Sequence, residues 1–209
     1  MQTIIHFIRH SKTRNPKHIV KGELPFRLTK QGEKEVVKLA KYLAENKKIE
    51  VIFYSPILRT KQVAKILKKY LPFVKLIPDK KLYEWLTPWQ GFTIKQIQKK
   101  PELQWQDYRK NPKKFYPLKK GETANIVLQR MLKFTNKVNK KYPGQEVIAV
   151  SHGDPIKLLR CYLETNKISG KMHAYSCTQP SITSFVFNGS KYKKTVYKSF
   201  IKKQNNLLQ

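Results

Sequence analysis

Four arginine and histidine residues stand at, or within a few residues of, the ends of short apolar runs in this chain. They are Arg9, His10, Arg59 and His152. The forked guanidinium groups of two arginines match the oxygens of a phosphate group, and a histidine can act as a nucleophile or a further donor. Together these residue types have the composition of a site for phosphoryl transfer, in which catalysis is mostly positioning and charge stabilisation.

The apolar runs that precede these residues are predicted strands. The runs are short and dominated by apolar side chains, and they cover residues 4–8, 49–54 and 146–150. This pattern is typical of strands covered on both faces in a parallel sheet. Ligands of such sheets bind just beyond the carboxyl ends of the strands. If the three strands are parallel, the arginine and histidine side chains therefore project at one edge of the sheet.

Amphipathic helical patterns separate the strands, and strands that alternate with such helices favour right-handed crossover connections. Helices are predicted from Thr29, over 57–70, from an N-cap at Thr123 to about Lys141 and from Pro155, and further strands over 74–77, 182–187 and 195–200. The Asn188-Gly189 dipeptide favours a hairpin between the last two strands. The sequence thus predicts an α/β fold, a three-layer α/β/α sandwich with a mainly parallel central sheet.

We expect one domain over residues 1–209, interrupted by an irregular segment at 82–120. All three tryptophans, Trp85, Trp89 and Trp105, lie in that segment. It is a candidate lid or substrate-pocket wall, and an equally good interpretation is a small satellite core under a long loop.

Positive charge is the most unusual feature of the composition. The chain has 44 Lys plus Arg against 13 Asp plus Glu, a net charge of +31. Such a charge can mark a surface that binds nucleic acid, but the lysines are spread along the whole chain and arginines are few, which favours a compositional bias. The positive field would still attract phosphorylated substrates.

Cysteine use and hydropathy argue against a cysteine metal site, a membrane-spanning protein and a secreted protein. Cys161 and Cys177 form no metal-ligand spacing and are expected to be reduced thiols. The chain has no apolar stretch of membrane-spanning length and no secretory signal. We therefore expect a cytoplasmic protein without a membrane contact.

Four motifs in order resemble those of the histidine phosphatase superfamily, also called phosphoglycerate mutase-like. They are Arg-His-Ser-Lys-Thr at 9–13, Ser-Pro-x-x-Arg-x-x-Gln-x-Ala at 55–64, Leu-Tyr-Glu at 82–84 with Trp-Gln-Gly at 89–91, and Val-Ser-His-Gly at 150–153. Gly-Glu-Thr at 121–123 is similar to a further motif of the family. The resemblance covers positions 4 to about 187.

This resemblance implies a role for each matched position. His10 would attack phosphorus and carry a phosphohistidine, while Arg9, Arg59 and His152 would bind the equatorial oxygens. Glu84 would protonate the leaving oxygen and later activate water. The implied reaction needs no metal and no cofactor, and its substrate is a small phosphorylated metabolite.

Further substrate-binding positions follow from the same resemblance. They are Thr13, Asn15, Gly22 and Gly153, together with Arg9 and Arg59. Asn15 matches its family position only loosely, one residue early and before Pro16. The remaining histidines have no such partners: His6 is interpreted as sheet-facing, and His18 and His173 as surface or loop residues.

The sequence departs from the family pattern at two positions, and two alternative functions are also considered. Ser11 stands where the family has glycine, and Gln90 replaces an acid. A phosphoglycerate mutase is disfavoured because residues 83–87 lack the Asn-Glu-Arg-His-Tyr-Gly stretch of the mutases. A non-catalytic polyanion-binding protein on the same scaffold is the other alternative, and salt-sensitive binding of nucleic acid would indicate it.

Overall fold

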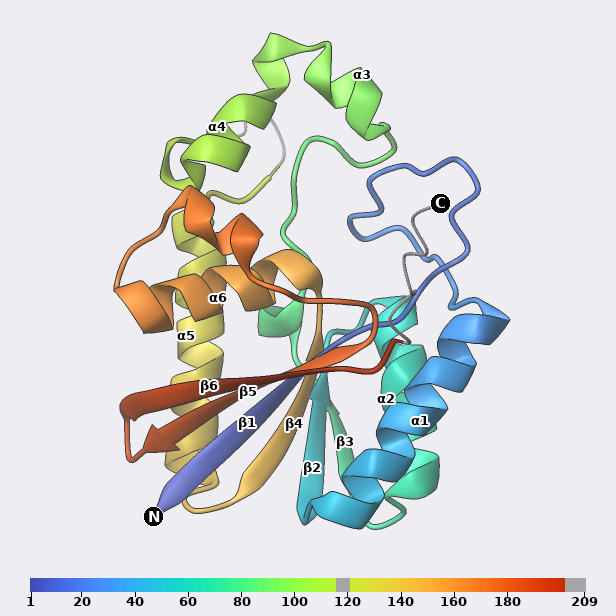
Figure 1. The fold of residues 1–209 in the computed structure, drawn as a ribbon, viewed down its shortest axis with the longest axis vertical. Coiled ribbons are helices and arrows are strands. Elements are labelled where there is room, and N and C mark those ends of the chain that lie inside the picture. The colour runs from blue at the N-terminus through green and yellow to red at the C-terminus, as the bar shows by residue number, and fades with distance from the viewer. Residues whose placement is uncertain (116–120, 202–209) are drawn as a thin grey trace, which may run out of the picture.

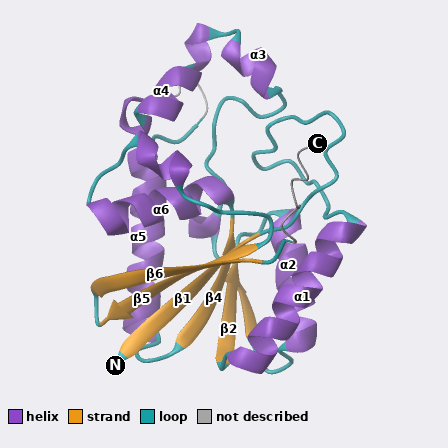
Figure 2. Cartoon of the chain, viewed as in Figure 1, coloured by secondary structure: helices purple, strands orange, loops and turns teal. Residues whose placement is uncertain are grey.

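A six-stranded mixed sheet forms the centre of the protein in the computed structural model, which describes residues 1–115 and 121–201 (Figures 1 and 2). Its strands are β1 (Gln2–Arg9), β2 (Ile49–Tyr54), β3 (Lys75–Pro78), β4 (Glu146–Ser151), β5 (Ser181–Asn188) and β6 (Lys191–Ser199). They lie in the order β3-β2-β4-β1-β5-β6. Strands β3, β2, β4 and β1 are parallel to one another. Strand β5 pairs antiparallel with β1, and β6 pairs antiparallel with β5.

Helices cover both faces of this sheet. They are α1 (Lys30–Asn46), α2 (Leu58–Tyr70), α3 (Ile94–Gln98), α4 (Trp105–Lys110), α5 (Ala124–Lys141) and α6 (Gly153–Thr165). Alternate residues of β1 serve the two faces: Ile5 and Phe7 pack with residues of α5 and α6, and Ile8 packs with residues of α1 and α2. The predicted three-layer α/β fold with a mainly parallel sheet is confirmed.

Side chains cap two helices where the sequence indicated that they begin. The hydroxyl of Thr29 accepts a hydrogen bond from the Gly32 N–H at 2.9 Å, at the start of α1. Thr123 does the same for Ile126 at 3.3 Å, at the start of α5. Each cap satisfies a backbone donor that the first helical turn leaves without a partner.

Two predicted boundaries are wrong. Helix α6 begins at Gly153 and not at Pro155, because His152 has extended backbone angles and is the N-cap residue. Pro155 is tolerated at the third helical position, where the N–H would have no intrahelical partner. Strand β6 begins at Lys191 and not at Thr195. Its first residues are lysine-rich and lie on an exposed edge, so they lack the apolar alternation that marks a strand.

Short helices and buried aromatic rings replace regular structure between β3 and α5. The rings of Trp89 and Tyr108 lie 4.8 Å apart, and Phe115 and Trp85 complete the cluster. Residues 116–120 of the predicted insertion lie outside the described residues. No helix within the described ranges is both long and apolar enough to cross a bilayer.

Candidate active site

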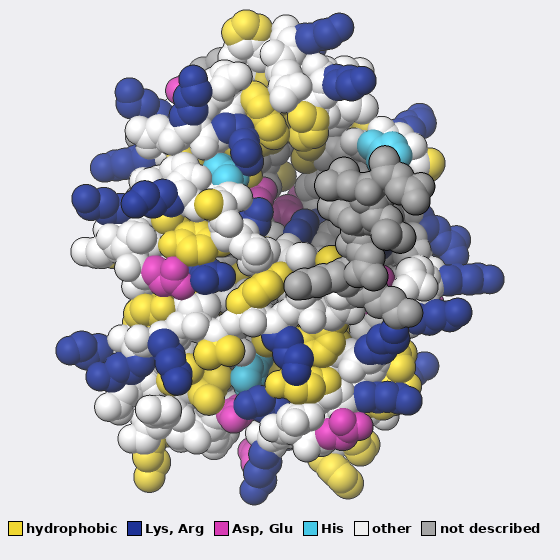
Figure 3. Space-filling model, in the orientation of Figure 1, with side chains coloured by type: hydrophobic (Ala, Val, Ile, Leu, Met, Phe, Trp, Pro, Cys, Tyr) yellow, Lys and Arg dark blue, Asp and Glu magenta, His cyan; other side chains and the backbone are white. Residues whose placement is uncertain are grey.

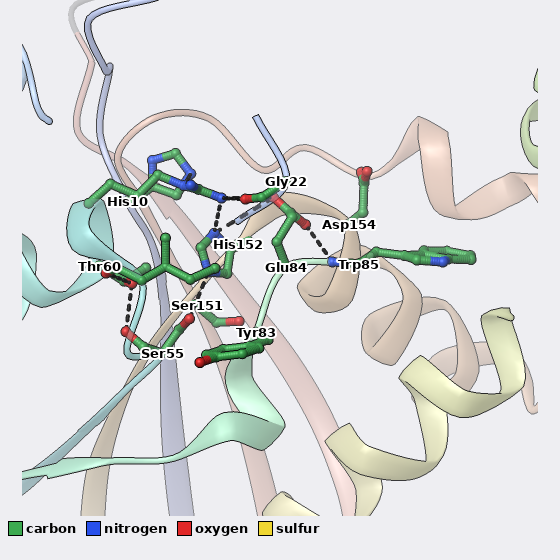
Figure 4. Close-up of polar contacts among 12 residues, drawn as sticks. His10, Gly22, Ser55, Thr60, Tyr83, Glu84, Trp85, Ser151, His152 and Asp154 are labelled. Atoms are coloured by element: carbon green, nitrogen blue, oxygen red, sulfur yellow. Dashed lines mark hydrogen bonds and ion pairs between the residues drawn. The ribbon is translucent and has the colours of Figure 1, made fainter. Parts of the chain in front are cut away.

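The carboxyl ends of three adjacent strands bring the predicted residues together. Strand β4 lies between β1 and β2, so His152 after β4 is flanked by His10 after β1 and by Ser55 after β2. The rings of His10 and His152 lie 5.3 Å apart, nearly edge to face. Figure 4 shows His10, His152 and Glu84 close together, with Ser55 on the other side of His152.

Arg59, on the first turn of α2, lies at the centre of this group and is fully buried. Its Nε donates to His10 Nε2 and its Nη2 to His152 Nδ1, each at 3.1 Å. Nη2 also donates to the carbonyl of Gly22 at 2.7 Å. The Glu84 carboxylate oxygen Oε2 lies 3.9 Å from the same nitrogen. One guanidinium group therefore orients both histidines and faces the carboxylate.

The hydrogen bonds of the ring nitrogens define the tautomers of His10 and His152. His10 Nδ1 lies 2.8 Å from the Ser11 carbonyl, which can only accept, so Nδ1 carries the proton and Nε2 keeps its lone pair. Arg59 can only donate, so His152 Nδ1 keeps its lone pair and the proton of the neutral ring is on Nε2, which lies 2.9 Å from Ser55 Oγ. Burial first, and Arg59 second, lower the pKa of both histidines well below the usual value. Both rings are thus neutral near neutral pH.

The carboxyl group of Glu84 is shifted in the opposite direction. Burial raises its pKa, and the nearby charge of Asp154 raises it further. Its Oε1 accepts the Trp85 N–H at 3.0 Å, and its Oε2 lies 3.7 Å from His152 Nδ1. Lowered histidine pKa values and a raised glutamate pKa open a pH range in which neutral imidazole rings and a protonated carboxyl group coexist.

A partly buried arginine on α5 holds the backbone on which Glu84 stands. Arg130 forms a bidentate pair with Glu122, at 2.7 and 2.9 Å. Its guanidinium also donates to the carbonyl oxygens of Lys81, Tyr83 and Glu84 at 2.7 to 3.1 Å. The Glu122 carboxylate in turn accepts the Leu86 N–H at 3.1 Å. The segment around Glu84 is therefore fixed by charge-assisted hydrogen bonds.

Two donors of the first motif are buried without a hydrogen-bond partner among the described residues. They are Arg9 Nε and Thr13 Oγ1. Arg9 is held in place by a hydrogen bond from its Nη1 to the Cys177 carbonyl. Its guanidinium also lies against Gly153, where an added Cβ would come within 3.0 Å of it. Buried unpaired donors are rare, and here they would suit an anion.

The remaining predicted positions shape the loop above the site. Gly22 has a φ of +47°, and a Cβ there would lie 2.3 Å from Gln90 Oε1. That Gln90 oxygen accepts the Glu23 N–H at 2.8 Å, which ties the loop to the segment after Glu84. The Asn15 amide bonds the backbone of Ile19 at 2.8 and 3.2 Å, so in this structure it holds the loop closed.

Ser11 occupies its glycine-like position without strain. Its side chain is fully buried and donates to the Glu35 carboxylate on α1 at 2.8 Å. The serine hydroxyl thus points to helix α1, and it makes no hydrogen bond to His10.

A pocket of about 370 Å³ opens beside the histidines. In Figure 3 a hollow lies between the upper helices and the sheet, with acidic and basic side chains in it. The sequence did not single out the charged lining residues Lys21, Arg109, Asp154 and Lys157 as site residues, nor Thr87, Tyr108 and His173. Asp154 directly follows the fourth motif, so its position could have drawn attention. The sequence indicated a surface or loop position for His173, yet its ring lies 4.9 Å from that of Tyr108.

Ligand atoms of His10, Glu84 and His152 lie within 4.8 Å of one another, which is close enough for a metal ion. The Arg59 guanidinium donates to both histidines and faces the carboxylate. The positive charge of Arg59 is therefore already in contact with all three residues and would repel a metal cation. The group fits a site for an anion better than a site for a metal ion.

Comparison with known proteins identifies the family. A model of the histidine phosphatase superfamily (branch 1) matches residues 5–199. The chain belongs to this superfamily. It is 29% identical to an uncharacterized protein of Mycobacterium tuberculosis, over 94% of this chain and 96% of that protein.

Two further similarities extend this result. The chain is 25% identical to phosphoserine phosphatase 1 of Hydrogenobacter thermophilus, over 83% of this chain and 82% of that protein. Its fold resembles that of YhfR from Bacillus stearothermophilus, with a TM-score of 0.83 and 22% identity, over 91% of this chain and 94% of that one. As a histidine phosphatase family member, the chain has the fold and the motif order that its sequence indicated.

Proposed function

We propose that the protein is a phosphomonoester hydrolase that works through a phosphohistidine at His10. The observation that carries this proposal is the state of the His10 ring. Its Nδ1 donates to the Ser11 carbonyl, so Nε2 holds a lone pair, and that atom faces Arg59. A neutral imidazole beside guanidinium groups is suited to attack a phosphate ester. The phosphoserine phosphatase relative supports this class of reaction.

The reaction has two steps. His10 Nε2 forms a bond to phosphorus while the bond to the ester oxygen breaks, and Glu84 gives its proton to that oxygen. Water then attacks the phosphohistidine, Glu84 takes the proton of the water, and the phosphorus–nitrogen bond breaks to release phosphate. The pKa of Glu84 is raised, so the carboxyl group is suited to exchange a proton in both directions.

Guanidinium groups would stabilise the transferred phosphoryl group. Arg59 would turn its Nε from His10 to a phosphoryl oxygen, and the unpaired Arg9 Nε and Thr13 Oγ1 would bind others. His152 would donate to the same oxygens in its other tautomer, with the proton on Nδ1 and with Nε2 accepting from the Ser55 hydroxyl. These side chains supply positive charge without a metal ion, so we expect activity that a chelator does not affect.

Hydrolysis of a generic aryl phosphate in the presence of EDTA tests this proposal. The wild-type protein is expected to release phosphate, with a rate that EDTA leaves unchanged. Salt-sensitive binding of RNA or DNA without turnover of any aryl phosphate or natural phosphate ester would instead favour the polyanion-binding alternative.

Removing the charge of Asp154 is expected to move the alkaline limb of the kcat–pH profile to lower pH. The Asp154 carboxylate raises the pKa of Glu84, whereas Arg59 and Arg9 lower it. In Asp154→Asn the raising contribution is lost, so Glu84 loses its catalytic proton at a lower pH. Asparagine can still accept the Tyr108 hydroxyl, which now bonds the aspartate at 2.5 Å. Profiles of kcat between pH 4 and 10 check this; the range spans the unperturbed values of Glu and Tyr, about 4.3 and 10.

Asp107→Asn is the matched control, because Asp107 is exposed on α4 and forms no part of the pocket lining. An alkaline limb that stays in place in Asp154→Asn would contradict the assignment of that limb to Glu84.

Loss of the Arg130 clamp is expected to lower kcat by about 10- to 100-fold, because small displacements of a catalytic group are costly. In Arg130→Met the backbone carbonyl oxygens of residues 81, 83 and 84 lose their shared donor, so Glu84 is less well placed. The loss should be greater for esters with poor leaving groups, which depend on the acid.

Rates for a leaving-group series, with thermal unfolding measured in parallel, check this prediction. Lys133→Met on the exposed side of α5 is the control. If Arg130→Met lowers the rate equally for good and poor leaving groups, the clamp has a general structural role and does not position Glu84.

A further inference from the structure

Three basic side chains that this mechanism does not use line the pocket beside His10. They are Lys21 in the loop after β1, Arg109 on α4 and Lys157 on α6. The acids of the same lining are Glu84 and Asp154, and His173 also lines the pocket. Burial lowers the pKa of His173, so this ring adds little positive charge near neutral pH. Beyond the reaction centre, cations thus outnumber anions.

These cations are not neutralised by any acid within the described residues. The side chains of Lys21, Arg109 and Lys157 form no ion pair there, and Asp154 Oδ2 accepts the Tyr108 hydroxyl. Lys21 is partly buried, and burial together with Arg59 and Arg9 lowers its pKa to about 8, although Glu84 acts in the opposite direction. A lysine held in this way is destabilised until an anion joins it.

Burial separates these lysines from the compositional excess of lysine. Most lysines in the described part of the chain are exposed, where a charge remains solvated and needs no partner. Lys47, Lys68 and Lys81 are partly buried, but each has a carboxylate or a carbonyl oxygen as a partner. Lys21 and Lys157 are instead partly buried, on elements far apart in the sequence, and line one concave site. A general bias towards lysine does not account for that convergence.

We propose that the substrate carries a second anionic group, a carboxylate or a second phosphate, that binds between Lys21 and Lys157 while its phosphomonoester lies at His10. This inference rests on the proposed function and names the substrate class of the same site. A pocket of about 370 Å³ suits a small metabolite. Apolar side chains of the lining, Ile19, Val20 and Ile94, offer contacts for its carbon skeleton.

Three matched esters test the inference: propyl phosphate, 3-phosphonooxypropanoate and propane-1,3-diyl bisphosphate. The wild-type protein is expected to show a kcat/KM at least about tenfold higher for the two esters with a second anion, as for a charge-assisted contact. In Lys21→Met and Lys157→Met that preference over propyl phosphate should fall by about tenfold. Lys65→Met, exposed on α2, is the control and should keep the wild-type preference. The ester with the higher kcat/KM identifies the anion as carboxylate or phosphate.

Equal kcat/KM values for the three esters in the wild-type protein would overturn the inference and leave the phosphatase proposal intact. Equal losses on all esters in both lysine variants would also overturn it, because the lysines would then contact the transferred phosphoryl group. If neither these esters nor any aryl or natural phosphate ester is hydrolysed, the proposed function fails, and binding of the three esters followed by tryptophan fluorescence still decides the inference. Tighter binding of the doubly anionic esters, lost in the lysine variants, supports it, and equal binding overturns it.

Discussion

Replacing His10 with alanine is expected to lower kcat by about 10⁴-fold or more, the loss that follows removal of a covalent nucleophile. In the structure His10 is buried, its Nδ1 bonds the Ser11 carbonyl and its Nε2 faces Arg59. His152 has a similar environment, with Nδ1 on Arg59 and Nε2 bonded to Ser55, but the family resemblance assigns it to binding of the phosphoryl oxygens and not to attack. If His10 is the phosphoryl acceptor, its loss should therefore not be compensated by His152.

Two measurements check this result. Steady-state hydrolysis of an aryl phosphate gives the loss of kcat, and intact-mass analysis after rapid acid-free quenching detects the phosphoryl group on the wild-type protein. His18→Asn is the matched control, since His18 is exposed and has a φ of 50°, a conformation that asparagine tolerates. Thermal unfolding shows whether His10→Ala is folded. A folded His10→Ala protein with wild-type turnover would show that another group accepts the phosphoryl group.

Replacing Glu84 with glutamine is expected to lower kcat by about 10²- to 10⁴-fold for esters with poor leaving groups, the usual contribution of general acid–base catalysis. Glutamine preserves the shape of the side chain and can still accept the Trp85 N–H, which now bonds Glu84 Oε1 at 3.0 Å. It has no proton to give to an alkoxide. A nitrophenolate leaves without protonation, so formation of the phosphohistidine from nitrophenyl phosphate should stay fast.

The second step gives the sharper test of Glu84. Water must lose a proton to attack the phosphohistidine, and glutamine cannot accept it. Glu84→Gln should therefore show a burst of nitrophenol followed by slow turnover, with phosphorylated protein accumulating. Glu102→Gln is the control, because that carboxylate is 58% exposed. Absence of both the burst and the leaving-group dependence would assign the acid to a different residue, and Asp154 would be the next to test.

The sequence by itself determined the local elements and the residue types of the site. Periodic apolar spacing and side-chain caps at Thr29 and Thr123 are local signals, and both helices begin where these residues indicated. A motif follows the end of each of the three buried strands, so Arg9, His10, Arg59 and His152 could be selected from the order of residues alone. Neighbouring residues along the chain suffice for such signals.

Tertiary structure alone decided how those residues meet. The insertion of β4 between β1 and β2 places His152 beside His10, and strand order is a long-range property that no local pattern carries. The same holds for the clamp, because Arg130 reaches Glu84 across 46 positions of the chain.

The pocket is the clearest case of this division. Lys21 and Lys157 are ordinary lysines in a chain of 44 basic residues, and their types and spacing gave no reason to select them. Only folding places both in one concave site and partly removes their charges from water. Desolvation depends on what packs around a side chain, and that packing comes from segments far apart in sequence. The motifs therefore indicated the family, whereas the lysines that we propose to select the substrate could be found only in the fold.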